Sequence, residues 1–406
     1  MTREEVQRQS LFMIQNHNRI ALQWCTGLGK SRAAIEAANY LYKNNKDLKV
    51  LLIVAEVAHK NNWEKEFNKW KFEVTNYTIE CYASLKKYRN TEWDLIIFDE
   101  AHHLGSELRM DVLTSISSKY VILLSATLQD IIINTLNNIF GEFVISKITL
   151  RQAIEMGALP EPKVYLIPLE LNNNNTNCTI IEEWGKKEKR VTLKCKYYER
   201  WSYMKNRTKY PNVTLEISCT QQQKYDYLTE QFEYWKRQFL RTRQEHTKNK
   251  WLQVGSKRKR FLGESKTEEV NLLLHKLKDK RYICFCTSIE QAELLGGNNS
   301  IHSKKSDSLD IINKFNNKYI NTLFAVGMLQ EGQNLNDISA GIIVQLDGQE
   351  RSFIQKFGRS LRAEDPIQFI FYYKDTRDTE YLENVLDGIN EDYITEIKSL
   401  TDFILY

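Results

Sequence analysis

The sequence lacks the features of membrane proteins and of disulfide-rich or zinc-binding proteins. No apolar run in its 406 residues approaches the roughly 20 residues of a membrane span, and the N-terminus has no apolar segment of the secretory kind. The seven cysteines are odd in number and form no C-x-x-C pair, which argues against a disulfide framework and a zinc site. We therefore expect the protein to stay in the cytoplasm of its own cell or of a host cell.

A large excess of charge of one sign is also absent. The chain has 57 Lys and Arg against 52 Asp and Glu, a formal net charge of +5 at pH 7. This balance excludes a uniformly basic surface, so the binding of any polyanion must depend on local patches. The length permits two or three domains with a large core.

The most informative segment is Thr26-Gly27-Leu28-Gly29-Lys30-Ser31, here called the P-loop. It lies between an apolar run at 20–24, which predicts a buried strand, and a run at 31–41, which predicts a helix. Glycines let a backbone approach phosphate closely, and a helix N-terminus offers amide donors and the positive end of its dipole. Lys30 would then reach the β- and γ-phosphates of a nucleotide, and the Ser31 hydroxyl would bind Mg²⁺.

One position departs from the full phosphate-binding pattern G-x-x-x-x-G-K-[ST]. Trp24 stands where that pattern has its first glycine, and we expect Gly27 to supply the flexibility instead. An ordinary turn at the start of a helix, with a lysine there by chance, is the alternative.

A second segment favours the nucleotide site. The apolar run at 95–98 predicts a central parallel strand buried on both faces, and it ends in Asp99 and Glu100. The carboxyl ends of such strands are where open α/β sheets place their sites. We assign Asp99 and Glu100, with Ser31, to the Mg²⁺ site, and Glu100 also to the activation of the attacking water as a general base. A solvated acidic turn is the weaker alternative, and the two segments together predict a nucleoside triphosphatase.

The order of predicted elements indicates an α/β fold with two doubly wound parallel sheets. The first 150 residues alternate strands and helices, and apolar strands recur at 321–326, 341–346 and 367–373. Pro160 and Pro162 mark a connector, followed by a predicted strand at 163–171. We divide the chain into a first lobe (1–150), a connector with the first strand of the second lobe (151–170), an insertion (171–265) and the rest of the second lobe (266–406).

These segments, with others in the same order, resemble the motifs of superfamily 2 helicases of the DExH type. The resemblance covers residues 1–170 and 265–375 and is nearest to compact phage-type DNA helicases and restriction-type translocases. It implies two RecA-like lobes, ATP and Mg²⁺ as cofactors, movement in the 3′→5′ direction, and nucleic acid, with DNA favoured over RNA, held through its backbone with little sequence preference. It assigns adenine recognition to Gln7, with Gln9 and Gln15 as competitors, and further nucleotide contacts to Thr26, Gly27, Leu28, Gly29, Arg32, Gly332 and Asn334.

The resemblance also assigns residues that link hydrolysis to movement. Ser125, Ala126 and Thr127 match the motif that couples the two, and Gln355, Arg359 and Arg362 match a catalytic motif. Arg359 and Arg362 lie three residues apart on a predicted helix, so both face one way and can neutralise the charge that develops on the γ-phosphoryl group. A solvated basic helix face is the alternative. Contacts with the nucleic acid are assigned to Thr287, Ser288, His302, Ser303 and Lys304.

The insertion has a distinctive composition. Residues 185–210 are dense in Lys and Arg, with Tyr and Trp between them. Basic groups bind phosphates and aromatic rings stack on bases, so we assign nucleic-acid contacts to Lys194, Lys196, Arg200 and Trp201. The alternative is a small β-rich module whose aromatics form its own core.

Three further segments carry predictions. Apolar residues recur at helical spacing from Tyr225 to Phe239, which predicts helix packing. The basic run at 257–260 has three possible interpretations: a solvated loop, a localisation signal or a contact with phosphate groups. A structural helix is expected at 381–397.

The interpretation that these observations favour is an ATP-driven motor that unwinds DNA or remodels branched DNA in replication, recombination or repair. The alternatives are a duplex translocase without processive unwinding, an RNA helicase and a non-catalytic binding module. The intact Lys30, Glu100 and Arg362 argue against the last.

Overall fold

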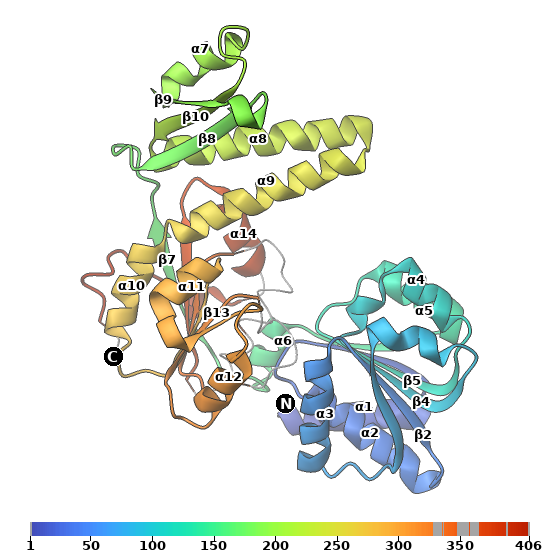
Figure 1. Cartoon of the computed structure of the whole chain (residues 1–406). Coiled ribbons are helices and arrows are strands. Elements are labelled where there is room, and N and C mark those ends of the chain that lie inside the picture. The colour runs from blue at the N-terminus through green and yellow to red at the C-terminus, as the bar shows by residue number, and fades with distance from the viewer. Residues whose placement is uncertain are drawn as a thin grey trace.

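The computed structural model describes residues 2–327, 335, 337–346, 357, 365–386 and 389–404. Five residues with predicted roles lie outside these ranges: Gly332, Asn334, Gln355, Arg359 and Arg362. Figure 1 shows two lobes, each built on its own sheet, and an insertion that projects from the second lobe. Among the described residues, no helix has the length and apolar character needed to cross a membrane.

The first lobe contains a six-stranded parallel sheet in the order β3-β2-β4-β5-β1-β6. Its central strands are continuous apolar runs, buried because helices cover both faces of the sheet. The strands are β1 (Arg19–Trp24), β2 (Lys49–Val54), β3 (Asn76–Cys81), β4 (Glu92–Asp99), β5 (Ser117–Ser125) and β6 (Val144–Ile148). The helices are α1 (Arg3–Asn16), α2 (Lys30–Asn44), α3 (Val57–Lys69), α4 (Glu107–Leu113), α5 (Asp130–Phe140) and α6 (Leu150–Glu155).

The second lobe contains a seven-stranded parallel sheet in the order β12-β13-β11-β14-β15-β7-β16. The α/β prediction with two doubly wound sheets is thus confirmed. The strands are β7 (Lys163–Leu169), β11 (Tyr282–Phe285), β12 (Ser300–Ile301), β13 (Thr322–Ala325), β14 (Ala340–Ile343), β15 (Ile367–Tyr373) and β16 (Ile394–Glu396). The helices are α10 (Thr267–Lys276), α11 (Ile289–Gly296), α12 (Ser308–Asn316) and α14 (Arg377–Leu386).

The prediction of one helix over 381–397 is wrong. Helix α14 ends at Leu386, and the chain returns to add β16 beside β7 at the edge of the sheet. The buried side chains of Ile389 and Ile397 anchor this return to the core of the lobe. Packing against the sheet therefore overrides the helical pattern of the sequence in this segment.

The insertion combines a small sheet with a long helical hairpin. Strands β8 (Cys178–Trp184), β10 (Val213–Cys219) and β9 (Val191–Lys196) lie side by side in that order, β10 antiparallel to β8 and parallel to β9. The helices are α7 (Arg200–Lys205), α8 (Gln221–Thr242) and α9 (Glu245–Glu264).

Aromatic residues hold the hairpin together. The Trp251 ring of α9 lies 5.8 Å from that of Phe232 and 5.7 Å from that of Phe239, both on α8, which confirms the prediction of helix packing there. The basic run at 257–260 is part of α9, so the expectation of a loop is wrong. Within this run Arg258 is buried against Phe232, because its guanidinium lies 4.3 Å from the centre of that ring.

Candidate functional site

Three neighbouring strands bring the predicted nucleotide-binding segments to one edge of the first sheet. Strand β5 lies between β1 and β4, and all three run parallel, so their carboxyl ends meet at that edge. The P-loop follows β1, Ser125 ends β5 and Asp99 ends β4. Ser125 is in register with Gln23, and Leu124 is in register with Asp99. Segments that are far apart in the sequence are therefore adjacent here, as expected for a site of this fold.

Two glycines give the P-loop its shape. Gly27 and Gly29 have φ angles of 100° and 83°, in the left-handed region that glycine adopts readily. Gly29 is the residue before α2. Because glycine has no side chain, none caps the first amides of that helix. Free helix N-terminal amides of this kind suit an anion.

Lys30 and Trp24 complete the loop. The Lys30 ammonium donates to the Trp24 carbonyl at 2.9 Å and to the Cys25 carbonyl at 3.5 Å, so its charge lies inside the loop that surrounds it. The Trp24 side chain points away into the core, where its indole donates to the Ser146 hydroxyl at 2.8 Å. The loop therefore accommodates a bulky residue at this position.

Gln7 on α1 packs directly against the P-loop. Its side chain is 2% exposed, and its amide nitrogen donates to the Leu28 carbonyl at 2.9 Å. A Cβ placed on Gly29 would lie 2.1 Å from that nitrogen, so a side chain there would displace Gln7, in addition to the strain of a φ of 83°. The amide oxygen of Gln7 is buried and has no hydrogen-bond partner among the described residues, which leaves it able to accept a hydrogen bond from the amino group of a nucleobase. Gln9 and Gln15 are exposed, so Gln7 is the glutamine that faces the loop.

Arg32, also assigned to the nucleotide, lies one turn into α2. Its guanidinium pairs with Glu36 at 2.7 Å and lies 4.4 Å from the centre of the Trp70 ring.

Asp99 and Glu100 are held in place by several hydrogen bonds. One Asp99 oxygen accepts from the Trp63 indole at 2.7 Å, and the other accepts from the Glu100 amide at 3.0 Å. The Tyr82 hydroxyl donates to the Asp99 carbonyl at 2.8 Å. Glu100 has a φ of 49°, a left-handed conformation that costs a non-glycine residue about 1–3 kcal/mol and that tends to occur at functional sites. The sequence placed Trp63 only in a helix that follows a family motif and connected neither Trp63 nor Tyr82 to Asp99, because no spacing rule joins them.

A chain of polar contacts links Glu100 to the end of β5. Nδ1 of His102 lies 3.3 Å from a Glu100 carboxylate oxygen and 3.1 Å from the Ser125 hydroxyl. The Ser125 hydroxyl lies 2.7 Å from the Thr127 carbonyl, and when it donates its proton there it accepts from Nδ1 of His102. The contacts therefore connect the carboxylate of Glu100 with the segment Ser125–Thr127.

In the second lobe, some of the five residues predicted to contact nucleic acid are exposed, and others are buried and support the fold. Ser303 and Lys304 are exposed and Thr287 is half-buried. Ser288 is 4% exposed and its hydroxyl caps α11 by accepting from the Gln291 amide at 3.2 Å, so it serves the fold and not the surface. His302 is also 4% exposed, with Nε2 lying 3.2 Å from Glu293, so a direct contact by its side chain is not supported.

The four residues proposed in the insertion divide in the same way. Arg200 is 5% exposed, and its guanidinium lies 3.6 Å from the centre of the Tyr197 ring and 3.6 Å from Glu230 on α8. It therefore holds α7 against α8, and its assignment as a nucleic-acid contact is a mistake of sequence reasoning, which cannot see burial. Lys194, Lys196 and Trp201 are exposed.

Comparisons with known proteins agree with this geometry. Residues 2–130 match the family described as Type III restriction enzyme, res subunit, and residues 265–364 match the Helicase conserved C-terminal domain. The two matches cover the P-loop, Asp99 and Glu100 in the first lobe, and β11, β12, β13 and β14 in the second. The chain is a superfamily 2 helicase. Members of these families use ATP to act on nucleic acid, so this helicase is an ATP-dependent enzyme.

Solved structures share the fold of this helicase at low sequence identity. S. cerevisiae Dbp5 bound to RNA and ADP BeF3 matches with a TM-score of 0.59 and 12% identity, over 97% of this chain and 89% of the other. The Pyrococcus furiosus Hef helicase domain matches with a TM-score of 0.51 and 13% identity, over 94% and 97%. The Type ISP restriction-modification enzyme LlaBIII bound to DNA matches with a TM-score of 0.53 and 12% identity, over 99% of this chain and 32% of that chain. These matches confirm two RecA-like lobes, and no curated protein matches the sequence.

Proposed function

We propose that this helicase is of the DExH type and that it uses ATP to unwind or remodel DNA. The observation that carries the proposal is the line of contacts from Glu100 through His102 to Ser125, beside the P-loop. Such a line gives the site both a base for hydrolysis and a connection from the nucleotide to a segment outside it.

The P-loop would bind the phosphates of ATP. Lys30 would exchange its two carbonyl partners for the β- and γ-phosphates, and the unpartnered Gln7 oxygen would accept from the adenine amino group. The Ser31 hydroxyl and the Asp99 carboxylate are hard oxygen ligands and fit Mg²⁺, which when bound neutralises charge on the phosphates.

Hydrolysis needs a base on one side of the γ-phosphate and positive charge on the other. Glu100 would take the proton of the attacking water, since its carboxylate is fixed by a strained backbone and by His102. Arg359 and Arg362, which lie outside the described residues, would supply the positive charge from the second lobe when the lobes close. Loss of the γ-phosphate would then change the position of Glu100, and the contacts of His102 with Ser125 would transmit this change to Ser125–Thr127.

The nucleic acid would lie across both lobes, with the exposed Ser303 and Lys304 touching its backbone, whereas the hydroxyl of Thr287 is buried. DNA is favoured by the likeness of the motif pattern to DNA helicases, and the DNA-bound LlaBIII shares the fold. The RNA-bound Dbp5 shares it too, so an RNA helicase is the second candidate.

ATP turnover measured against a panel of nucleic acids tests the proposal. The panel contains single-stranded, duplex and forked DNA, and the matching RNA structures. We expect the largest stimulation with forked or single-stranded DNA. Stimulation by duplex DNA alone would indicate a translocase, stimulation by RNA alone would identify an RNA helicase, and no stimulation by any member would reject the proposed function.

We also propose that the far end of the insertion binds nucleic acid. The exposed rings of Tyr198 and Trp201 are 68% and 49% accessible, and they lie among exposed basic residues. We call this set the α7 surface: Lys186, Lys187, Lys189, Lys194, Lys196, Tyr198, Trp201, Lys205, Arg207 and Lys209. Figure 1 places α7 at the end of the insertion remote from the second lobe.

Replacing Lys194, Lys196 and Trp201 with Ala should weaken binding of a single strand while leaving Tm unchanged, because all three side chains are exposed. Loss of stacking by Trp201 should cost about 1–3 kcal/mol, and each lost phosphate contact should reduce the slope of affinity against salt by about 0.7. Fluorescence anisotropy titrations over a range of salt concentrations measure both. Arg200→Ala is the contrasting variant, expected to lower Tm because it removes a buried contact between α7 and α8. Unchanged affinity and slope in the triple variant would make the α7 surface a structural feature.

A further inference from the structure

The turn of the α8–α9 hairpin concentrates positive charge. Residues 236–250 contain six Lys or Arg and a single acidic residue, Glu245, so this short segment alone has a formal excess of +5, equal to that of the whole chain. We call it the basic turn; its cations are Lys236, Arg237, Arg241, Arg243, Lys248 and Lys250. Figure 1 shows it at the end of the hairpin farthest from α10.

The charge of the basic turn is largely uncompensated. Arg237, Arg241, Arg243, Lys248 and Lys250 are exposed. Among the described residues, the ion pair found within the turn joins Lys248 to Glu245 at 4.0 Å, the limit of such a contact. Arg243 ends α8 in a left-handed conformation with a φ of 54°. Several exposed cations on a protruding turn suit a partner with regularly spaced negative charges, which is the backbone of a nucleic acid.

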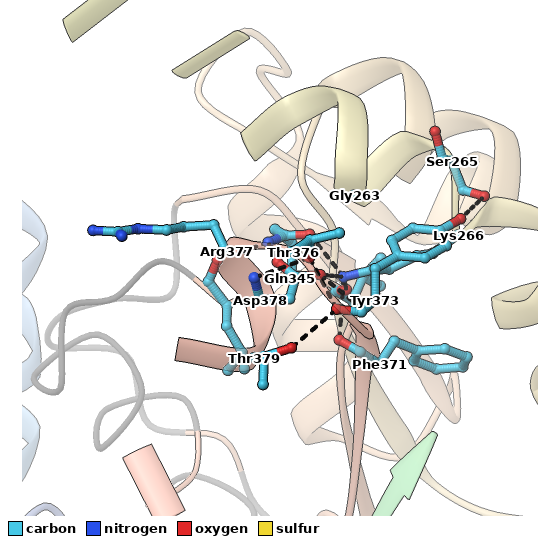
Figure 2. A network of polar contacts seen from close by, with 12 residues as sticks. Gly263, Ser265, Lys266, Gln345, Phe371, Tyr373, Thr376, Arg377, Asp378 and Thr379 are labelled. Carbon is cyan, nitrogen blue, oxygen red and sulfur yellow. Dashed lines mark hydrogen bonds and ion pairs between the residues drawn. The ribbon is translucent and has the colours of Figure 1, made fainter. Parts of the chain in front are cut away.

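Helix α9 carries this turn directly into the second lobe. Lys266, two residues after the end of α9, is the residue before α10, and its side chain is fully buried. Its ammonium lies 2.6 Å from Asp378, 2.8 Å from the Gln345 side-chain oxygen, 3.0 Å from the Val344 carbonyl and 3.2 Å from the Phe371 carbonyl. Four acceptors surround three N–H donors, so every proton of the ammonium is used. Figure 2 shows these contacts converging on Lys266.

The partners of Lys266 are themselves tied together. The second Asp378 oxygen accepts from the Gln345 amide, and the Tyr373 amide donates to Asp378 at 3.1 Å. The Tyr373 hydroxyl donates to the carbonyl of Ser265, the residue before Lys266, at 2.9 Å. Burial lowers the pKa of Lys266, and the Asp378 carboxylate acts in the opposite direction. A buried charge with this many partners holds its surroundings in one arrangement.

The position of this cluster gives it a functional meaning. Val344 and Gln345 follow β14, Phe371 belongs to β15, and residues 347–364 between them include Arg359 and Arg362. Lys266 therefore forms hydrogen bonds with the chain on both sides of residues 347–364, at the end of β14 and in β15. A second link comes from α8, where the Tyr225 hydroxyl accepts from the Arg377 amide at 2.8 Å.

The end of α9 also touches a residue that the sequence predicted as a nucleic-acid contact. A Cβ on Gly263 would lie 1.9 Å from the Thr287 hydroxyl oxygen, so α9 packs on Thr287 with no room to spare. The Gln291 side chain of α11 donates to the Gly263 carbonyl at 2.8 Å. Displacement of α9 must therefore move either the segment around Thr287 or the Lys266 cluster.

We propose that the α8–α9 hairpin is a nucleic-acid sensor, in which the phosphate backbone binds the basic turn and Lys266, as a positioning residue, couples that binding to the segment that carries Arg359 and Arg362. The proposal rests on the proposed function, because it assumes that nucleic acid stimulates ATP turnover. It identifies a surface separate from the α7 surface and a route from that surface to the nucleotide.

The first experiment tests the basic turn. Arg237→Ala/Arg241→Ala/Lys250→Ala should raise the concentration of forked DNA that gives half-maximal ATP turnover, by roughly tenfold or more, and should flatten its dependence on salt. Lys65→Ala/Lys278→Ala/Lys398→Ala removes the same charge from exposed sites elsewhere and should do neither. Equal half-maximal concentrations and salt slopes in the two variants would overturn the binding role of the turn.

The second experiment tests the coupling. Lys266→Met leaves Asp378 buried without its cation and should lower Tm, whereas Lys266→Met/Asp378→Asn removes both charges and should recover much of the loss. In the double variant we expect the half-maximal DNA concentration to stay near that of wild type while the maximal stimulation over the DNA-free rate falls by roughly tenfold. Phe315→Leu, in the core away from the cluster, provides a destabilised control that should keep its stimulation.

The outcomes separate the two proposals. A double variant with the wild-type maximal stimulation would overturn the coupling and reduce the cluster to a structural role. A wild-type protein that no nucleic acid stimulates would instead reject the proposed function, and the sensor with it. Loss of stimulation in the double variant at unchanged DNA affinity, with the control unaffected, is the result expected of a positioning residue.

Discussion

Lys30→Ala should abolish ATP turnover, with a loss on the order of 10²–10³-fold or more, because it removes the cation that would meet the β- and γ-phosphates. In the structure this cation has no acidic partner among the contacts of the P-loop and is held by two backbone carbonyls, an arrangement that a phosphate can replace. Phosphate release from the purified variant, with and without forked DNA, is the measurement.

A matched control lies on the same helix. Lys43, in the last turn of α2, is remote from the P-loop, and Lys43→Ala should hydrolyse ATP at the wild-type rate. A Lys30→Ala variant that turns over ATP as fast as Lys43→Ala would refute the phosphate site, and with it the tolerance of Trp24 at the first position of the pattern.

Glu100→Gln should bind ATP but hydrolyse it roughly 10²–10⁴-fold more slowly, because an amide cannot take the proton of the attacking water. Glutamine has the same shape and can keep its place beside His102, so the contact of His102 with Ser125 should survive. The variant should therefore accumulate with ATP and nucleic acid bound together. Equilibrium binding of a fluorescent ATP analogue and single-turnover hydrolysis distinguish the two effects.

The control for this variant is Glu92→Gln, at the exposed start of the same strand, which should behave as wild type. If Glu100→Gln loses ATP binding together with hydrolysis, the carboxylate supports the loop and is not the base. The strained backbone at Glu100 makes this a real alternative, since side chains at such positions can also serve the fold.

The sequence alone predicted the sheets because these depend on local patterns, and it predicted a nucleotide site from segments that the structure brings to one edge of the first sheet. Parallel strands buried on both faces are continuous apolar runs, and the residues that bind phosphate must follow such strands closely. Gln7 needed the structure to distinguish it from Gln9 and Gln15, because only burial against Leu28 separates them.

Predictions failed where burial decides the role of a polar residue. Arg200 and Arg258 occur in basic runs that suggest an exposed surface, yet both side chains pack on aromatic rings. Ser288 and His302 likewise face the scaffold. Trp63 could not be found by spacing, because its contact with Asp99 joins two elements whose relation only the fold determines. The Lys266 cluster unites residues from 266 to 378 for the same reason.

The place of β7 in the second sheet has a consequence for how the chain folds during synthesis. Lys163 of β7 pairs with Ile367 of β15, and β16 then pairs with the other side of β7. The first sheet uses only residues up to Ile148, so that lobe can form while the ribosome is still making the rest. β7 must wait until its two neighbours emerge, with both of its hydrogen-bonding edges unsatisfied meanwhile. The insertion, which follows β7 at once and has its own core, can fold in that interval, before the strands that pair with β7 are made.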